Sequence, residues 1–143
     1  MNHLGKIMAV VDTNVLVSAL LSSTLNSNPF IILEAIYKQV LIPIINDKIV
    51  EEYASVLKRP KFHFTEQQVD TFLASINKYG LSVEAIQVND EEFPDKKDMV
   101  FYEVKMAIDD SYLITGNIKH FPKKSFVVTP AEMVFILKQK KLI

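Results

Sequence analysis

The chain contains no cysteine among its 143 residues. Disulfide bonds and thiolate zinc sites are therefore excluded, and any bound metal ion must be held by oxygen ligands or by the three histidines. An excess of charge of one sign is also lacking, because the formal net charge is -1. This balance argues against a protein that coats polyanions through its overall charge, although a local basic patch can still attract nucleic acid.

Long hydrophobic runs, linkers and internal repeats are absent as well. No apolar run approaches transmembrane length. The apolar stretch 7–21 is interrupted by Asp12 and Asn14, unlike the core of a signal peptide. We therefore expect a cytoplasmic protein that does not enter a membrane. With 49% hydrophobic residues and no linker that divides the chain, we expect a single domain over residues 1–143.

The rest of the chain is organised around segment 7–21, which reads IMAVVDTNVLVSALL. Residues 7–11 form a short, β-branched apolar run, typical of a strand buried on both faces of a parallel sheet. Asp12, Thr13 and Asn14 follow at once and favour the start of a helix. Asp12 is thus expected at the carboxyl end of a central strand, where open α/β sheets bind their ligands. A simple helix cap is the alternative role for Asp12.

Helical and strand patterns alternate through the remaining chain, separated by turn residues and caps. Such alternation predicts a three-layer α/β/α fold with a central parallel sheet of about five strands. In order, the patterns predict a helix at 30–37, a strand at 40–45, a helix at 49–58, a helix from the Thr65 capping box to Gly80, an outer strand at 82–88, a helix at 98–108, strands at 112–115 and 125–128, and a final helix from Pro130.

Two adjacent glutamates in helix 49–58 are expected to behave differently. Because successive residues of a helix are turned by about 100°, Glu51 points nearly opposite the apolar face, whereas Glu52 lies on its flank. Glu51 is therefore predicted to be solvated, and Glu52 to reach along the rim of the core.

Helix 98–108 is nearly apolar all round and is predicted to be buried. Asp98 lies in its first turn, where the helix dipole favours a carboxylate. Glu103 lies in the middle of the apolar arc, where a carboxylate needs a hydrogen bond, an ion pair or a metal ion. The preceding acidic loop, which contains Asp90, Glu91, Glu92 and Asp95, is expected to be solvated.

Asp12, Glu52 and Asp98 thus occupy strand ends, helix starts or the rim of the core. If Asp12 and Asp98 meet above the sheet edge, they repel each other unless a cation lies between them. Carboxylate oxygens without cysteine suit Mg²⁺ or Mn²⁺. The sequence therefore predicts a divalent metal site at this edge.

Several motifs, in this order and spacing, resemble PIN-domain proteins of the kind found as ribonuclease toxins in toxin–antitoxin pairs. They are VVDTNVLVSALL, EEYASVLKRPKF, DMVFYEVKMA, SYLITGN and VVTPAEM, and they span essentially the whole chain. The resemblance implies a compact α/β/α domain whose acidic pocket binds Mg²⁺ or Mn²⁺. It further implies hydrolysis of phosphodiester bonds in single-stranded RNA. An antitoxin protein is the implied partner, and the formation of a homodimer is left open.

Carried over by position, Asp12, Glu52 and Asp98 match the catalytic and metal-binding acids of that family. Asn14 matches the polar residue that supports the first acid. Thr115 matches the threonine of the strand-end motif. The resemblance therefore implies a site built from three separate segments of the chain.

The chain departs from the family at Asn117, where many members carry aspartate. An amide oxygen can still ligate or orient a water, but it adds no negative charge. We hypothesise that Glu103 points into the pocket and replaces part of this charge; the alternative is a Glu103 that pairs with a lysine or a backbone amide in the core. Lys119, His120 and Lys123 follow directly and are candidates for contacts with the RNA backbone, or else form a solvated loop.

Two other functions fit parts of the sequence. A phospho-accepting receiver domain shares the alternating layout, but it needs a pair of acids before its first helix, and Asp12 has no neighbouring acid there. A PIN fold that binds RNA or a protein partner without cutting is the second alternative, and Asn117 is compatible with it.

Overall fold

The computed structural model describes residues 5–88, 93 and 95–143 and contains a single parallel sheet. Its strands lie in the order β3-β2-β1-β4-β5, and the predicted parallel sheet of five strands is confirmed. The strands are β1 (Ile7–Val11), β2 (Leu41–Ile45), β3 (Leu81–Ser82), β4 (Tyr112–Ile114) and β5 (Val127–Val128).

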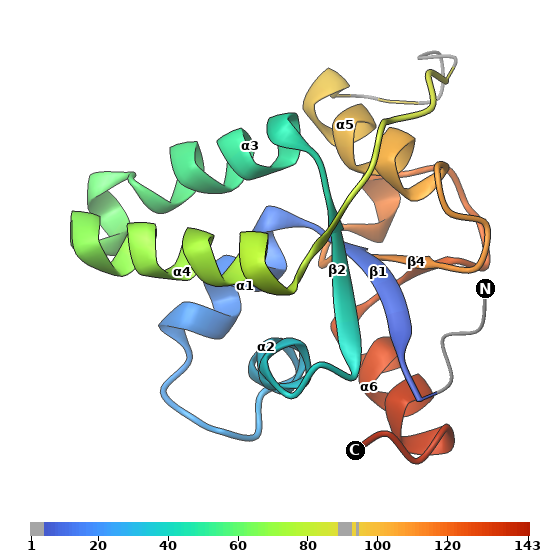
Figure 1. The fold of residues 1–143 in the computed structure, drawn as a ribbon, viewed down its shortest axis with the longest axis horizontal. Helices are drawn as coiled ribbons and strands as arrows, with labels where there is room; N and C mark the ends of the chain where they lie inside the picture. The colour runs from blue at the N-terminus through green and yellow to red at the C-terminus, as the bar shows by residue number, and fades with distance from the viewer. Residues whose placement is uncertain (1–4, 89–92, 94) are drawn as a thin grey trace.

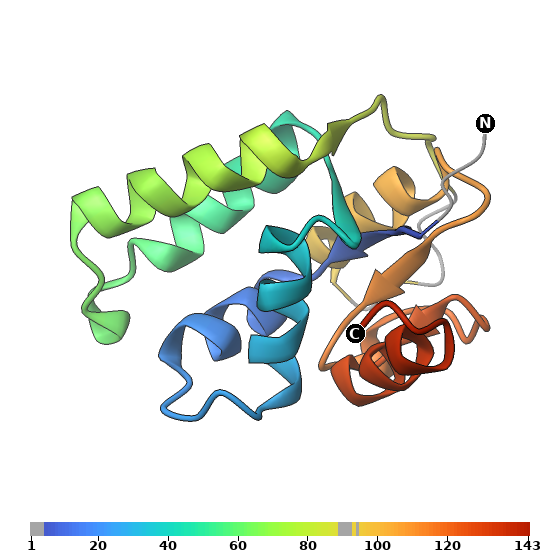
Figure 2. The same cartoon turned by 60° about the horizontal axis from the view of Figure 1, so that its bottom comes forward.

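Helices cover both faces of this sheet (Figure 1). Helix α5 packs over β1, β2 and β4 on one face, while α2 and α6 lie together on the other, as Figure 2 shows from a second direction. The α-helices are α1 (Thr13–Leu21), α2 (Asn28–Tyr37), α3 (Asp47–Leu57), α4 (Glu66–Tyr79), α5 (Lys96–Lys105) and α6 (Pro130–Gln139), and short 3₁₀ helices occupy Pro60–Phe62 and Ile118–His120. The predicted three layers are therefore present.

The centre of the sheet sets the position of the functional edge. Strand β1 is buried along its whole length and pairs with β2 on one side and β4 on the other. After β1 the chain builds β2 and β3 outward on one side and then returns to add β4 and β5 on the opposite side. A crevice therefore opens between the carboxyl ends of β1 and β4, which is where ligands bind in open α/β sheets.

The outer strand predicted at 82–88 is shorter than expected. Only Leu81 and Ser82 form β3, although Val83 still donates a backbone hydrogen bond to Ile45. Beyond it, the backbone amide of Ile86 donates to the carbonyl of Glu103. The segment therefore leaves the sheet because it hydrogen-bonds to α5 instead.

Local caps fix several helix starts as the sequence predicts. Thr65 and Thr129 each form a reciprocal capping box, with Gln68 and Glu132 respectively. Helix α5 begins two residues earlier than predicted because Asp95 caps it by accepting the backbone amide of Lys97 at 2.9 Å. In the part of the chain that the structure describes, no helix is long and apolar enough to cross a membrane.

Gly80 follows the end of α4, as predicted. Its φ is -83°, so it does not adopt the left-handed conformation that favours glycine at helix ends. A Cβ at this position would lie 2.6 Å from the carbonyl oxygen of Ile76 and 3.1 Å from that of Pro43. Gly80 is therefore required for space, where the end of α4 passes close to β2.

Candidate active site

The carboxylate of Asp12 is the anchor of the site. Only 6% of the residue is exposed, and its Oδ2 accepts hydrogen bonds from Thr115 Oγ1 at 2.8 Å and from Asn14 Nδ2 at 3.2 Å. Although Asp12 occupies the N-cap position of α1, its side chain makes no capping hydrogen bond. The alternative that Asp12 serves merely as a helix cap is therefore wrong.

The turns after β1 and β4 are joined by further hydrogen bonds around Asp12. The backbone amide of Asn117 donates to Thr115 Oγ1 at 2.9 Å, and that of Gly116 donates to Asn14 Oδ1 at 3.2 Å. Asn14 and Thr115 thus lie where the sequence places the residues that support the first acid. The parallel pairing of β1 with β4 brings together the residues of two of these bonds, Thr115 to Asp12 and Gly116 to Asn14, which are about a hundred positions apart in the sequence.

A cavity of about 380 Å³ opens beside Asp12 and collects acids from three elements. Glu52 reaches it from α3 and Asp98 from the first turn of α5, so all three acids carried over from the family line one cavity. Glu51 is exposed and does not line it. The placement of Glu52 rather than Glu51 at the cavity is confirmed.

Burial and like charges raise the pKa of two of these acids. Burial raises the pKa of Asp12 above its ordinary value, and the hydrogen bond from Thr115 opposes that rise most strongly. Burial, followed by the charge of Asp12, raises the pKa of Asp98 to about 6. His120 opposes the second shift, since its Nδ1 lies 3.4 Å from Asp98 Oδ2. Perturbed carboxylates that share a cavity are typical of functional sites.

The donor atoms of this cavity suit a divalent cation chemically. Asp12, Glu52, Asp98 and the amide of Asn117 offer hard oxygen ligands, and a cation would relieve the repulsion that raises the pKa of Asp98. Among the described residues, however, no three histidine or carboxylate side chains already stand together at metal-ligand positions. The side chains at the rim therefore have to turn toward Asp12 to share one ion.

Two buried hydroxyl groups beneath the site were not predicted from the sequence. The phenol of Tyr53, on α3, is fully buried and donates a hydrogen bond to the carbonyl of Val11, directly before Asp12. Its pKa is raised by burial and by the charge of Asp12. The hydroxyl of Thr13 is buried without a hydrogen-bond partner among the described residues. Thr13 also lines the cavity, so its hydroxyl lies next to the carboxylate of Asp12 in the chain and in the site.

The cavity also contains residues that sequence reasoning did not assign to it. Asp95 was expected in a solvated loop and is exposed, yet it lines the cavity beside Asp98; Asp90, Glu91 and Glu92 lie outside the described residues. Arg59, Lys97 and Phe62 line it as well. The segment Lys58-Arg59-Pro60-Lys61-Phe62, in which three basic residues and an aromatic residue surround a proline, was the sequence signal that could have indicated Arg59 and Phe62.

The hypothesis that Glu103 points into the acidic cavity is wrong. Its Oε2 accepts the backbone amide of Val88 at 3.0 Å, and its side chain lines a different cavity together with Asn46 and Lys48. The alternative, in which Glu103 pairs with a backbone amide, is therefore the arrangement observed. The bond satisfies the half-buried carboxylate and holds the segment after β3 against α5.

The three residues proposed to contact RNA differ in position. His120 lines the cavity and approaches Asp98, whereas Lys119 and Lys123 are exposed and do not line it. Both lysines are therefore accessible to a ligand that extends beyond the cavity. Their contact with RNA remains a prediction.

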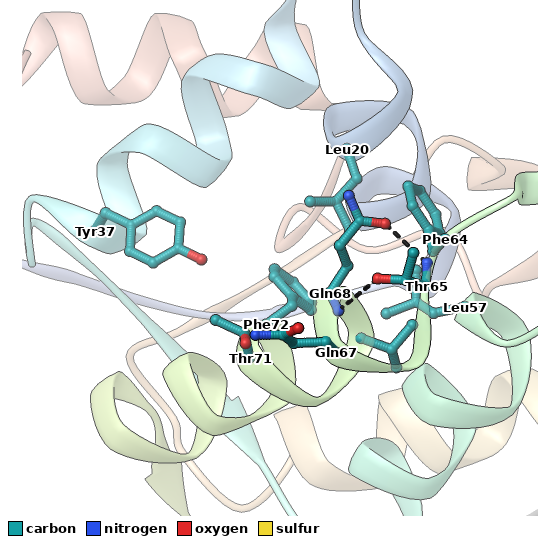
Figure 3. A pocket seen from close by; sticks show the side chains of 10 residues that line it. Leu20, Tyr37, Leu57, Phe64, Thr65, Gln67, Gln68, Thr71 and Phe72 are labelled. Atoms are coloured by element: carbon teal, nitrogen blue, oxygen red, sulfur yellow. Dashed lines mark hydrogen bonds between the residues drawn. The ribbon is translucent and has the colours of Figure 1, made fainter.

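A second cavity, of about 460 Å³, lies between α1 and α4 (Figure 3). It is lined by Leu20, Leu57, Phe64 and Phe72, with the capping box of Thr65 and Gln68 at its rim. None of the described residues that line it is an aspartate, glutamate, histidine, lysine or arginine. The clustered carboxylates therefore line the cavity at Asp12 and not this larger apolar one.

The raised pKa of Asp98 predicts a pH-dependent gain in stability for Asp98→Asn. Because the folded protein holds this proton more tightly than the unfolded chain, ionisation destabilises the fold as pH rises from about 4 through about 6. In metal-free buffer, Asp98→Asn should therefore have a higher Tm than wild type at about pH 7.5 and a similar Tm at about pH 4. Thermal unfolding with Glu51→Gln as control checks this, and a Tm lower than wild type at both pH values would contradict it.

Comparison with protein families matches residues 8–119 to the PIN domain. Comparison with curated proteins gave no significant match. The matched region contains Asp12, Glu52, Asp98 and Thr115. PIN domains are generally nucleases and typically use divalent metal ions. The match covers well over half of the chain, and the chain therefore belongs to the PIN-domain family.

Proposed function

We propose that this protein is an endoribonuclease that hydrolyses single-stranded RNA with Mg²⁺ or Mn²⁺. The observation that supports this most strongly is the meeting of Asp12, Glu52 and Asp98 in one cavity at the switch point of the sheet. These acids come from three separate segments, and no common structural role explains why all three border the same cavity.

In this proposal, the oxygens of Asp12, Glu52, Asp98 and Asn117 hold the cation. When bound, the ion supplies charge neutralisation and Lewis-acid activation of the phosphate. The protein supplies a fixed geometry, since Thr115 and Asn14 hold the Asp12 carboxylate in one orientation. Such supporting hydrogen bonds orient ligands and adjust their affinity for the metal.

Lys97 adds an ammonium group and His120 adds an imidazole to the wall of the same cavity. A phosphodiester brought next to the carboxylates would meet these groups on its non-bridging oxygens, where negative charge has to be stabilised during hydrolysis. His120 contacts Asp98 in the free protein, so in this proposal a bound cation or phosphate competes for that contact.

A PIN domain that binds RNA without cutting it is the second candidate. Asn117 supports this candidate because it removes one negative charge from the cavity. The absence of a preformed group of three ligands among the described residues supports it as well. A cleavage assay separates the two candidates, since the second gives metal-independent binding and no product.

We predict that Asp12→Ala and Asp98→Ala abolish Mg²⁺- or Mn²⁺-dependent cleavage of single-stranded RNA. Glu52→Gln should lower the rate by roughly 100-fold or more, because it removes an oxygen charge from the proposed metal site. Glu51→Gln is the matched control on the adjacent exposed position and should cut at the wild-type rate. The assay follows a labelled oligoribonucleotide with and without EDTA, and circular dichroism verifies the fold of each variant.

Equal rates for Glu51→Gln and Glu52→Gln would overturn the assignment of Glu52. Cleavage at the wild-type rate by purified Asp12→Ala would overturn the site as a whole. RNA binding without cleavage by the wild-type protein, in either metal, would establish the non-cutting candidate instead.

We also propose that the protein is a toxin that a cognate antitoxin neutralises, on the basis of its likeness to PIN-domain toxins. Induced expression in a bacterial host should then arrest growth because cellular RNA is cut, and Asp12→Ala should not arrest growth. Colony counts after induction measure this, with Glu51→Gln as the active control. Growth arrest by Asp12→Ala to the same extent would show that the toxicity does not come from cleavage.

A further inference from the structure

The cavity at Asp12 has one wall that its acids do not explain. Arg59 and Phe62 line this wall, and both follow α3, the helix that carries Glu52. The other apolar side chains of the cavity, including Phe101 and Val17, belong to the buried core, whereas Phe62 is only half-buried. An aromatic ring thus faces a cavity whose remaining lining is mainly charged or polar.

A rigid turn holds these two residues in place. Pro60 fixes the backbone at the start of the 3₁₀ helix Pro60–Phe62. The amide of Phe62 donates to the carbonyl of Arg59 at 3.1 Å, and that of His63 donates to the carbonyl of Pro60 at 3.1 Å. His63 then closes the turn with a positive φ of 59°. The backbone that carries Arg59 and Phe62 is therefore held in one conformation.

The guanidinium of Arg59 is available to a ligand. The side chain is exposed, and none of the described residues forms an ion pair with it, although the cavity contains four carboxylates. Glu52 lies within α3, whereas Arg59 lies beyond the C-cap residue Lys58, in extended backbone. Arg59 is therefore suited to a phosphate other than one held at the carboxylates.

The ring of Phe62 is suited to a nucleobase. Its neighbours are Phe64, with ring centroids 6.2 Å apart and planes inclined by 29°, and Lys61, whose Nζ lies 5.1 Å from the ring centroid. Lys61 is exposed, so a base that stacks on the ring can displace its ammonium group toward the adjoining phosphate. Unpaired bases stack on aromatic side chains in many proteins that bind single strands, whereas the bases of a duplex are not available for this.

We propose that Arg59 and Phe62 form a subsite for one unpaired nucleotide next to the scissile phosphate. Phe62 stacks on the base, and Arg59 pairs with the phosphate of that nucleotide. This subsite rests on the proposed function as an RNA-cleaving enzyme, and it explains how the enzyme selects single-stranded RNA. In this proposal, the acids carry out the hydrolysis, and Arg59 and Phe62 hold the RNA strand in a fixed position relative to the acids.

The test measures binding separately from cleavage. Binding of a short labelled single-stranded oligoribonucleotide is measured by fluorescence anisotropy in an Asp98→Asn background, in which cleavage is silenced. Phe62→Leu should weaken binding about 10-fold, because stacking on one base is lost, and Phe62→Trp should retain it. Phe135→Leu, on a 63% exposed phenylalanine of α6, is the control and should bind unchanged.

An oligonucleotide series with one abasic nucleotide at successive positions sharpens the test, and its first arm uses the parent protein alone. The parent protein should bind the oligonucleotide that is abasic at one particular position about 10-fold more weakly than the others. In the Phe62→Leu variant, the affinity should no longer depend on the abasic position. Arg59→Ala should weaken binding to every oligonucleotide in the series, whereas Lys58→Ala, which does not line the cavity, should not.

The outcomes separate the subsite from the proposed function. If RNA binds with this dependence on Phe62 but the wild-type protein never cuts, the subsite stands and the nuclease proposal fails. If the protein cuts, and neither Phe62→Leu nor any abasic position changes binding, the subsite is overturned while the nuclease proposal stands. A protein that neither binds nor cuts single-stranded RNA overturns both.

Discussion

The hydrogen bond from Thr115 to Asp12 joins the two strands between which the functional crevice opens. It is 2.8 Å long and buried, and it links residues that are far apart in the sequence but lie at adjacent strand ends. A buried carboxylate without such a partner would be strongly destabilising. With Thr115 and Asn14 donating to it, Asp12 remains fixed at the edge of the sheet. Every other group of the site is placed relative to this carboxylate.

The acids of the cavity oppose folding rather than support it. Burial and then the charge of Asp12 raise the pKa of Asp98, and Asp95 and Glu52 act in the same direction. Sites that concentrate like charges in this way lower stability in the free protein and are retained where the charge is needed for function. His120 partly compensates from the loop after β4, and a divalent cation would compensate more completely.

Local patterns allowed much of the fold and the acids of the site to be predicted. The apolar run before Asp12 indicated a buried central strand, and the position of Glu52 on the helical face indicated the rim of the core. Capping boxes at Thr65 and Thr129 fixed two helix starts. These features depend on residues close together in sequence, so no tertiary information was needed.

Features that depend on tertiary packing escaped sequence reasoning. The sequence places Glu103 in the apolar arc of its helix whether its carboxylate points into the cavity or pairs with a group in the core. Only the course of the chain after β3 gives this carboxylate the amide of Val88 as its partner. A Cβ at Gly80 would meet the carbonyl oxygens of Ile76 and Pro43, and no local pattern reports the approach of Pro43 in β2. Arg59 and Phe62 reach the cavity because the turn at Pro60 brings the chain back toward Asp12, and their spacing alone does not predict that.

A titration with Mn²⁺, followed by isothermal calorimetry, tests most directly whether these acids form one divalent cation site. The account predicts saturable binding by the wild-type protein and by Glu51→Gln, and its loss in Asp12→Asn and Glu52→Gln. Binding of equal strength by Asp12→Asn, in a correctly folded protein, would contradict the account, because the ion would then lie somewhere other than at the carboxyl ends of β1 and β4.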